Sequence, residues 1–123
     1  MDKKKILIVD DEKDFGQMVK LNLEKGGEYD VRVESVPGYA IETAKYFKPD
    51  LIFLDIVMPD LDGMSVFNQL QDEDDLRGIP VVFLTAIMSQ EEVARCKGVA
   101  SEHIVLAKPI KLDKLIECIK NNT

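Results

Sequence analysis

Residues 51–55 read LIFLD, four apolar residues in a row followed directly by an aspartate. Residues 6–10 repeat this pattern as ILIVD, and residues 81–85 repeat it as VVFLT, with a threonine in the last place. A short and continuous apolar run is typical of a strand that is buried on both of its faces. The three stretches therefore predict the central strands of a parallel sheet, each with a polar side chain at its carboxyl end.

Helical patterns alternate with strand patterns along the whole chain. Alternating apolar and polar residues predict a half-exposed edge strand over residues 29–34, and residues 104–107 form the last strand candidate. Helices are expected around 15–23, ended by Gly26-Gly27; 40–47, stopped by Pro49; 66–70; 91–97, where the pattern is weak; and 112–119. Five strands alternating with five helices predict one α/β domain over residues 1–123, with a doubly wound parallel sheet in the order 2-1-3-4-5.

The overall charge restricts the partners of this chain. Sixteen basic and 23 acidic residues give a net charge of −7, which disfavours direct binding of nucleic acid or of an anionic membrane. The apolar runs are too short to span a bilayer, and the apolar stretch after the lysines at 3–5 stops after four residues, so we expect no export signal and a cytoplasmic location. The acidic run at 72–75 is most simply a solvated loop, with an acidic docking patch as the alternative.

The chain contains too few cysteine and histidine residues for many common enzyme active sites. Cys96 and Cys118 have no partner motif and are interpreted as reduced thiols on helices. A zinc site is nearly excluded, because it would need ligands that this chain does not carry. His103, the only histidine, is interpreted as a surface residue at the start of a strand. A Ser/His/Asp triad would have to use it, and no nucleophile elbow accompanies it.

The polar residues at the strand ends are expected to meet. Parallel strands of a doubly wound sheet bring their carboxyl ends to one crevice, where Asp10, Asp11, Asp55, Thr85 and Lys108 would face each other. Two carboxylates about 4 Å apart repel by about 4 kcal/mol at an effective dielectric constant of about 20. Oxygen ligands of this kind suit Mg²⁺, and an aspartate beside a metal ion, a hydroxyl and a lysine is a suitable phosphoryl acceptor.

Each of these residues has a simpler interpretation when it is taken alone. Asp10 and Asp11 could be an acid pair favoured by a helix dipole, and Asp55 could be a turn residue. Thr85 could be an ordinary β-branched strand residue, and Lys108 could be a solvated loop lysine. Their joint occurrence at the ends of four strands favours a functional site.

Four segments together resemble the receiver domain of two-component response regulators, and the resemblance covers essentially the whole chain. They are residues 6–12 (ILIVDDE), 51–59 (LIFLDIVMP) with Asp62-Gly63, 82–86 (VFLTA) and Lys108-Pro109. The resemblance implies a flavodoxin-like (βα)5 fold. It also implies a signalling switch that catalyses only its own phosphorylation and dephosphorylation.

The resemblance further assigns roles to individual residues. It implies that Asp55 is the phosphoacceptor, that Asp11 and Asp55 bind Mg²⁺ directly together with the backbone carbonyl of Val57, and that Asp10 acts largely through water. Asp62-Gly63 is interpreted as a turn that leads into the third helix, with no chemical role.

Two further residues would contact the phosphoryl group. By resemblance Thr85 takes one phosphoryl oxygen and Lys108 pairs with another, so that Asp55, Thr85 and Lys108 carry the catalysis. The bond between Lys108 and Pro109 is expected to be cis, which aims the lysine into the site.

The implied partners are a histidine kinase or a histidine phosphotransfer protein and an output protein or domain that the sequence does not identify. A phosphorylation-dependent dimer through residues 91–97, 104–107 and 112–119 is a further expectation. Val105 stands where receivers usually carry an aromatic residue, so the aromatic rotamer switch of the family is expected to be absent or moved. Val57 and Ile87 are apolar and cannot orient a hydrolytic water, which predicts that dephosphorylation is not especially fast.

Two other functions fit the sequence less well. An aspartyl phosphohydrolase of the haloacid-dehalogenase type would carry a second acid two residues after its nucleophile, where this chain has Val57, and would need a cap domain. A degenerate receiver that only binds partners would have lost the acid pair, the acceptor or the lysine, and this chain retains all of them.

Overall fold

The protein forms a parallel five-stranded sheet in the order β2-β1-β3-β4-β5. The computed structural model describes residues 3–56, 63–85, 105–107 and 111–123. Their elements are β1 (Lys4–Val9), α1 (Lys13–Glu24), β2 (Tyr29–Glu34), the short 3₁₀ helix η1 (Pro37–Tyr39), α2 (Ala40–Phe47), β3 (Leu51–Asp55), α3 (Gly63–Asp72), β4 (Val81–Thr85), β5 (Val105–Ala107) and α5 (Leu112–Asn122). The predicted strand order is confirmed, and helices follow β1, β2, β3 and β5 as predicted; the helix expected after β4 lies outside the described residues.

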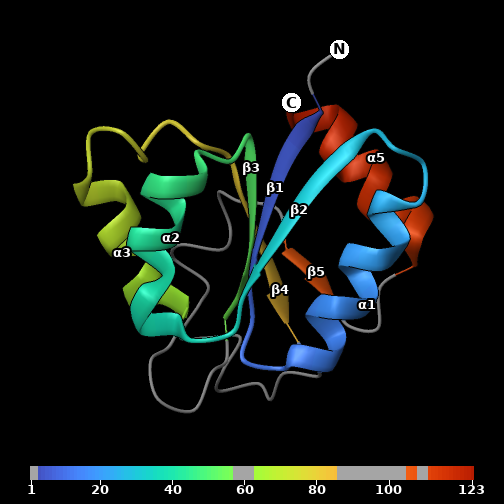
Figure 1. Cartoon of the computed structure of the whole chain (residues 1–123). Coiled ribbons are helices and arrows are strands. Elements are labelled where there is room, and N and C mark those ends of the chain that lie inside the picture. Colours follow the sequence, from blue (N-terminus) through green and yellow to red (C-terminus); the bar gives the residue numbers. More distant parts are fainter. Residues whose placement is uncertain (1–2, 57–62, 86–104, 108–110) are drawn as a thin grey trace.

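Helices cover both faces of the sheet, and α1 and α5 lie on one side while α2 and α3 lie on the other (Figure 1). Successive residues of a strand point to opposite faces, so each buried strand contributes to two cores. In β1, Leu7 and Val9 pack with the core under α2 and α3, whereas Ile6 and Ile8 pack with the core under α1 and α5. This double burial explains why the central strands are continuously apolar.

Strand β2 is the edge that its alternating pattern predicts. Its outer backbone groups at Val31 are bonded by two side chains of α1: the Val31 N–H donates to Glu24 Oε2 (3.0 Å), and Lys20 Nζ donates to the Val31 carbonyl (2.9 Å). Lys20 and Glu24 are themselves an ion pair, with Nζ and Oε1 3.2 Å apart. An uncovered strand edge is a template for pairing with another chain, so these two side chains, here called the edge clamp, close the β2 edge at Val31.

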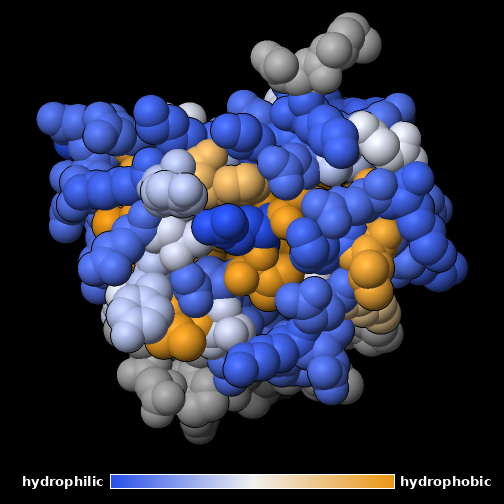
Figure 2. Space-filling view, in the orientation of Figure 1, coloured by the Kyte–Doolittle hydropathy of each residue, from blue (hydrophilic) through white to orange (hydrophobic). Residues whose placement is uncertain are grey.

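The surface on the β2 side is mostly hydrophilic, with small separate apolar patches (Figure 2). The acidic run is less uniformly solvated than expected: Asp72 ends α3, and the half-buried Glu73 lies 2.9 Å from Lys45 Nζ of α2. Among the described residues, none of the helices has the length and apolar character that a membrane span requires.

Helix ends differ slightly from the prediction. α1 ends at Glu24, and Gly27 beyond it has a φ of 76°. α2 ends two residues before Pro49, because Lys48 adopts the left-handed conformation with a φ of 54° and donates its N–H to the Ala44 carbonyl (2.9 Å).

Cys118 is a free and buried cysteine on α5, as expected. Residues 91–97, Cys96 and His103 lie outside the described residues.

Candidate phosphoacceptor and metal site

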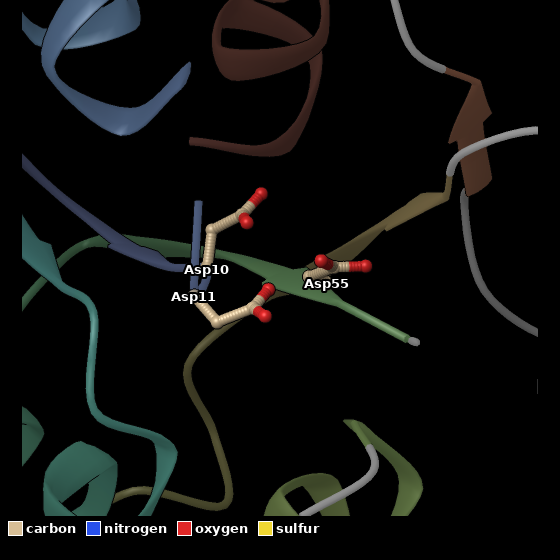
Figure 3. A group of neighbouring side chains, drawn as sticks. All are labelled: Asp10, Asp11 and Asp55. Carbon is tan, nitrogen blue, oxygen red and sulfur yellow. The ribbon is translucent and has the colours of Figure 1, made fainter. Parts of the chain in front are cut away.

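The carboxyl ends of β1 and β3 bring three aspartates together. Asp10 and Asp11 follow directly after β1, and Asp55 is the last residue of β3. The two strands are neighbours in the sheet, with Val9 opposite Leu54. One carboxylate oxygen from each aspartate lies within 4.8 Å of the others. Figure 3 shows the three side chains standing together at the strand ends.

Two of these carboxylates are almost completely buried. Asp10 is 0% exposed and Asp55 is 2% exposed, while Asp11 is partly accessible. They are the only polar or charged residues among the buried residues that the structure describes. Because burial of a charge is costly, buried acids normally pair with other groups or coordinate metals. Burial and mutual proximity distinguish this cluster from a solvated acidic surface and make it the candidate functional site.

Local backbone contacts position Asp10. Its N–H donates to the Glu34 carbonyl of β2 (3.1 Å), which continues the sheet by one residue. Its Oδ1 accepts a hydrogen bond from the N–H of Glu12 (2.9 Å), the N-cap residue of α1. The predicted alternative, an acid that serves a helix start, therefore accounts for one oxygen of Asp10. It does not account for the convergence of Asp10 on Asp55.

Asp55 is positioned by the neighbouring strand β4 and by the start of α3. Asp55 is registered with Leu84 of β4, and the next amide, Ile56 N–H, donates to the Leu84 carbonyl (2.9 Å). On the α3 side, the Gly63 N–H donates to the Ile56 carbonyl (2.8 Å). The acceptor candidate thus sits on a rigid strand end rather than on a loop, which favours a fixed position for its carboxylate.

The donor set fits a hard divalent cation. All three candidate ligands are carboxylates, and oxygen ligands of this kind are what Mg²⁺ prefers. A divalent charge among the three oxygens would also convert mutual repulsion into attraction. The residues present are therefore compatible with Mg²⁺ on both ligand chemistry and charge.

The remaining predicted site residues are only partly located. Thr85 is the last residue of β4, the strand next to β3. Val57, Ile87, Lys108 and Pro109 lie outside the described residues, so their roles stay predictions. One residue near the acceptor was assigned no chemistry from the sequence, namely Gly63, which contacts the backbone of Asp55. Its place directly after Asp62, at the expected start of a helix, was the only available signal.

Comparisons with known proteins agree with this geometry. The sequence pattern of the family described as "Response regulator receiver domain" matches residues 6–120. This chain belongs to that family. Receiver domains act in two-component signalling, where a phosphoacceptor role is standard, where an acidic pocket binds Mg²⁺, and where histidine kinases and output domains are the partners.

Relatives of this receiver domain include both short and long proteins. The polar-differentiation response regulator DivK of Brucella anthropi is 31% identical over 118 residues, which cover 96% of this chain and 94% of DivK. The DNA-binding dual master transcriptional regulator RpaA of Synechocystis is 33% identical over 119 residues, 94% of this chain but 47% of RpaA. The chain thus spans about half the length of RpaA, and 33% of the Bacillus subtilis regulator PhoP.

Solved receiver structures have the same fold. The chemotaxis protein CheY4 of Vibrio cholerae gives a TM-score of 0.85 at 25% identity and covers 99% of this chain and 100% of its own. The receiver domain of a signal transduction histidine kinase from Syntrophus aciditrophicus gives 0.82 at 30% identity, with coverage of 96% and 88%. The flavodoxin-like fold expected from the resemblance is therefore confirmed.

Proposed function

We propose that residues 1–123 form one receiver domain in which Asp55 accepts a phosphoryl group in a Mg²⁺-dependent reaction. The observation that carries the proposal is the convergence of Asp10, Asp11 and Asp55 within 4.8 Å, with two of the three side chains buried. Acids that serve only solubility lie on the surface, whereas these stand at the carboxyl ends of neighbouring strands, where parallel α/β sheets bind ligands.

The transfer itself requires little covalent chemistry from the protein. An Asp55 carboxylate oxygen attacks the phosphorus of a phosphohistidine, so that a P–O bond forms while the P–N bond breaks and the imidazole nitrogen keeps its electron pair. Asp11, Asp55 and the Val57 carbonyl would hold the cation directly, and Asp10 would act largely through water. When bound, Mg²⁺ supplies positive charge that neutralises the carboxylates and the phosphoryl oxygens.

Thr85 and Lys108 contact the oxygens of the transferred group. A hydroxyl and an ammonium at these oxygens stabilise the added negative charge, and their movement toward it couples phosphorylation to the conformation of the domain. The same site catalyses its own dephosphorylation, in which water attacks the phosphorus and the Asp55 carboxylate leaves. Because Val57 and Ile87 cannot orient that water, the half-life of the phosphorylated state is longer than seconds.

The partners follow from the charge and the family. The donor is a histidine kinase or a histidine phosphotransfer protein in the cytoplasm, and the output is a protein contact or a further domain. A net charge of −7 disfavours DNA binding by this domain itself. A phosphorylation-dependent dimer through β5 and α5 together with residues 91–97 completes the proposal.

Intact-mass spectrometry tests the proposal directly. Incubation with Mg²⁺ and acetyl phosphate should add one phosphoryl group to the protein, and EDTA should prevent the addition. Asp55→Asn should abolish it, while Asp75→Asn, a change of an exposed acid beyond α3, should leave it intact. No mass gain, or a gain that survives Asp55→Asn, would refute the assignment of the acceptor. Multiple turnover of a generic phosphate ester would instead favour the phosphohydrolase.

A further inference from the structure

The first residue of α3 lies against the backbone of the acceptor strand. A Cβ atom built on Gly63 would stand 2.2 Å from the Asp55 carbonyl oxygen, 2.7 Å from Ile56 Cα and 3.0 Å from the Asp55 carbonyl carbon. All three are backbone atoms, so no side-chain rotation can make room. Gly63 is buried, and its own N–H donates to the Ile56 carbonyl at 2.8 Å.

We propose that Gly63 is a positioning residue for the phosphoacceptor: the absence of a side chain lets α3 seat on residues 55–56 and so fixes the Asp55 carboxylate relative to Asp10 and Asp11. This inference rests on the proposed function of Asp55. It adds that the acceptor geometry depends on a helix that contributes no group to the chemistry.

Both partners of this contact are held firmly, so a side chain at position 63 could not be absorbed elsewhere. Strand β3 is paired with β1 on one side and with β4 on the other. Helix α3 is anchored in the core through Val66, Phe67 and Leu70, and the Phe67 ring lies 5.3 Å from that of Phe83. An added methyl group must therefore displace either the end of β3 or the start of α3.

The requirement at Gly63 is space, not backbone freedom. Gly27 has a φ of 76° and serves a left-handed turn, whereas Gly63 has no positive φ. A Cβ atom built on Gly16 would stand 2.5 Å from Val33 Cγ1, but that atom belongs to a side chain. Gly78 has open space around its Cα and no positive φ. Among the described glycines, only Gly63 meets the backbone of a proposed catalytic residue.

The decisive variant is Gly63→Ala, compared with Gly78→Ala. Displacement of a reacting group by about 1 Å can slow a reaction about a hundredfold. We expect Gly63→Ala to weaken Mg²⁺ binding several-fold in calorimetric titration. It should also slow phosphorylation by acetyl phosphate at saturating Mg²⁺ at least tenfold, at a temperature where the variant is folded. Gly78→Ala should match the unaltered protein in both measurements.

A stability-matched control separates positioning from simple destabilisation. Val66→Ala weakens the packing of the same helix at a fully buried position and adds no atom at the contact with residues 55–56. If Val66→Ala lowers the thermal midpoint as much as Gly63→Ala but keeps the Mg²⁺ affinity and the maximal rate, the positioning role is supported. If both variants lose affinity and rate equally, or if a folded Gly63→Ala behaves normally, the inference is overturned while the assignment of Asp55 stands.

A measurement on the unaltered protein covers the case in which Gly63→Ala does not fold. In an NMR titration with Mg²⁺, the amide resonances of Gly63 and Ile56 should shift with one common dissociation constant, because the contact links both to the acceptor. If the Gly63 amide resonance does not shift while the amide resonances of Asp10 and Asp11 do, the inference is overturned. Absence of any phosphoryl gain by the unaltered protein would refute the proposed function instead.

Discussion

Two groups of charged residues, one at the carboxyl ends of two central strands and one on α1 beside the edge strand, use charge in opposite ways. At the carboxyl ends of β1 and β3, Asp10, Asp11 and Asp55 bring charges of the same sign within 4.8 Å. At the β2 edge, Lys20 and Glu24 bring opposite charges to 3.2 Å and bond the backbone of Val31. The edge clamp is satisfied by the protein alone, whereas the aspartate cluster concentrates negative charge that an added cation relieves.

The difference between the two groups separates a structural role from a functional one. A pair of opposite charges that also forms hydrogen bonds with the backbone of an edge strand stabilises the fold and requires no ligand. A buried group of like charges destabilises the fold. Its presence therefore indicates that the cluster is favourable in another state of the protein, namely with a cation added. Experiments that change the cation, the cluster and the clamp should therefore give three distinct responses.

The largest expected effect is stabilisation by Mg²⁺. A ligand that binds only the folded state at a hundred times its dissociation constant raises the free energy of unfolding by about 2.7 kcal/mol. Urea unfolding with and without Mg²⁺ measures this directly, with Ca²⁺ as a test of selectivity. Glu24→Gln should show the same Mg²⁺ shift, because the clamp takes no part in binding. If the urea midpoint of unfolding is the same with and without Mg²⁺, the proposed difference between the aspartate cluster and the edge clamp is refuted.

An intermediate effect, with a change of sign, is expected for Asp11→Asn. Without divalent cations the substitution removes repulsion and should raise the free energy of unfolding by about 1 kcal/mol. With saturating Mg²⁺ the variant should be the less stable protein, because it has lost a ligand. Asp14→Asn in the first turn of α1 is the matched control: it loses a favourable interaction with the helix dipole and should destabilise under both conditions.

The Asp11 comparison also decides between the two interpretations of the acid pair. If Asp11→Asn destabilises the protein without Mg²⁺ as Asp14→Asn does, Asp11 is an ordinary acid at a helix start. If the sign reverses between the two conditions, the residue belongs to the cation site.

The smallest effect is expected at the clamp. Glu24→Gln should lower the free energy of unfolding by about 0.5 kcal/mol near neutral pH, since the side chain is about one-third exposed and its ion pair is partly screened. Glu117→Gln is the control, because its looser pair with Lys114 (3.9 Å) touches no strand edge. Equal losses in the two variants would show that closing the edge adds nothing to an ordinary surface ion pair.

The pH dependence of the Glu24 effect has a definite sign. Burial by itself would raise the pKa of Glu24, but the Val31 N–H, the Lys20 ammonium and the charge of Lys3 together outweigh it and lower the pKa below its ordinary value. A lowered pKa means that the stabilisation is present above the unfolded-state pKa and is lost as the pH falls through the folded-state pKa. The difference between Glu24→Gln and the unaltered protein should therefore vanish in acid.

Sequence periodicity was sufficient for the sheet and for the aspartate cluster. The continuous run at residues 51–54 predicted a strand buried on both faces, and the alternation at Tyr29, Val31 and Val33 predicted an edge. Because parallel strands end at one side of a sheet, the acids after two such strands could be placed together. The left-handed Lys48 was not predicted, because Pro49 offered a simpler stop for α2.

Contacts between different secondary-structure elements escaped prediction. Neither the approach of Gly63 to Asp55 nor the bonds from Lys20 and Glu24 to Val31 has a local pattern, because each depends on how closely a helix seats on the sheet. Likewise, the sequence predicts that Glu73 is part of a solvated acidic run, whereas in the structure it pairs with Lys45 of α2. Such details are set by packing rather than by composition or period.

The strand order has a consequence for synthesis. Strand β1 is made first, yet it lies between β2 and β3 and pairs with both. During translation, the apolar stretch of β1 therefore has no complete set of neighbours until residue 55 has left the ribosome. The segments up to residue 55 must therefore emerge before β1 is shielded on both edges, and in that interval the nascent chain exposes a strongly apolar strand to chaperones.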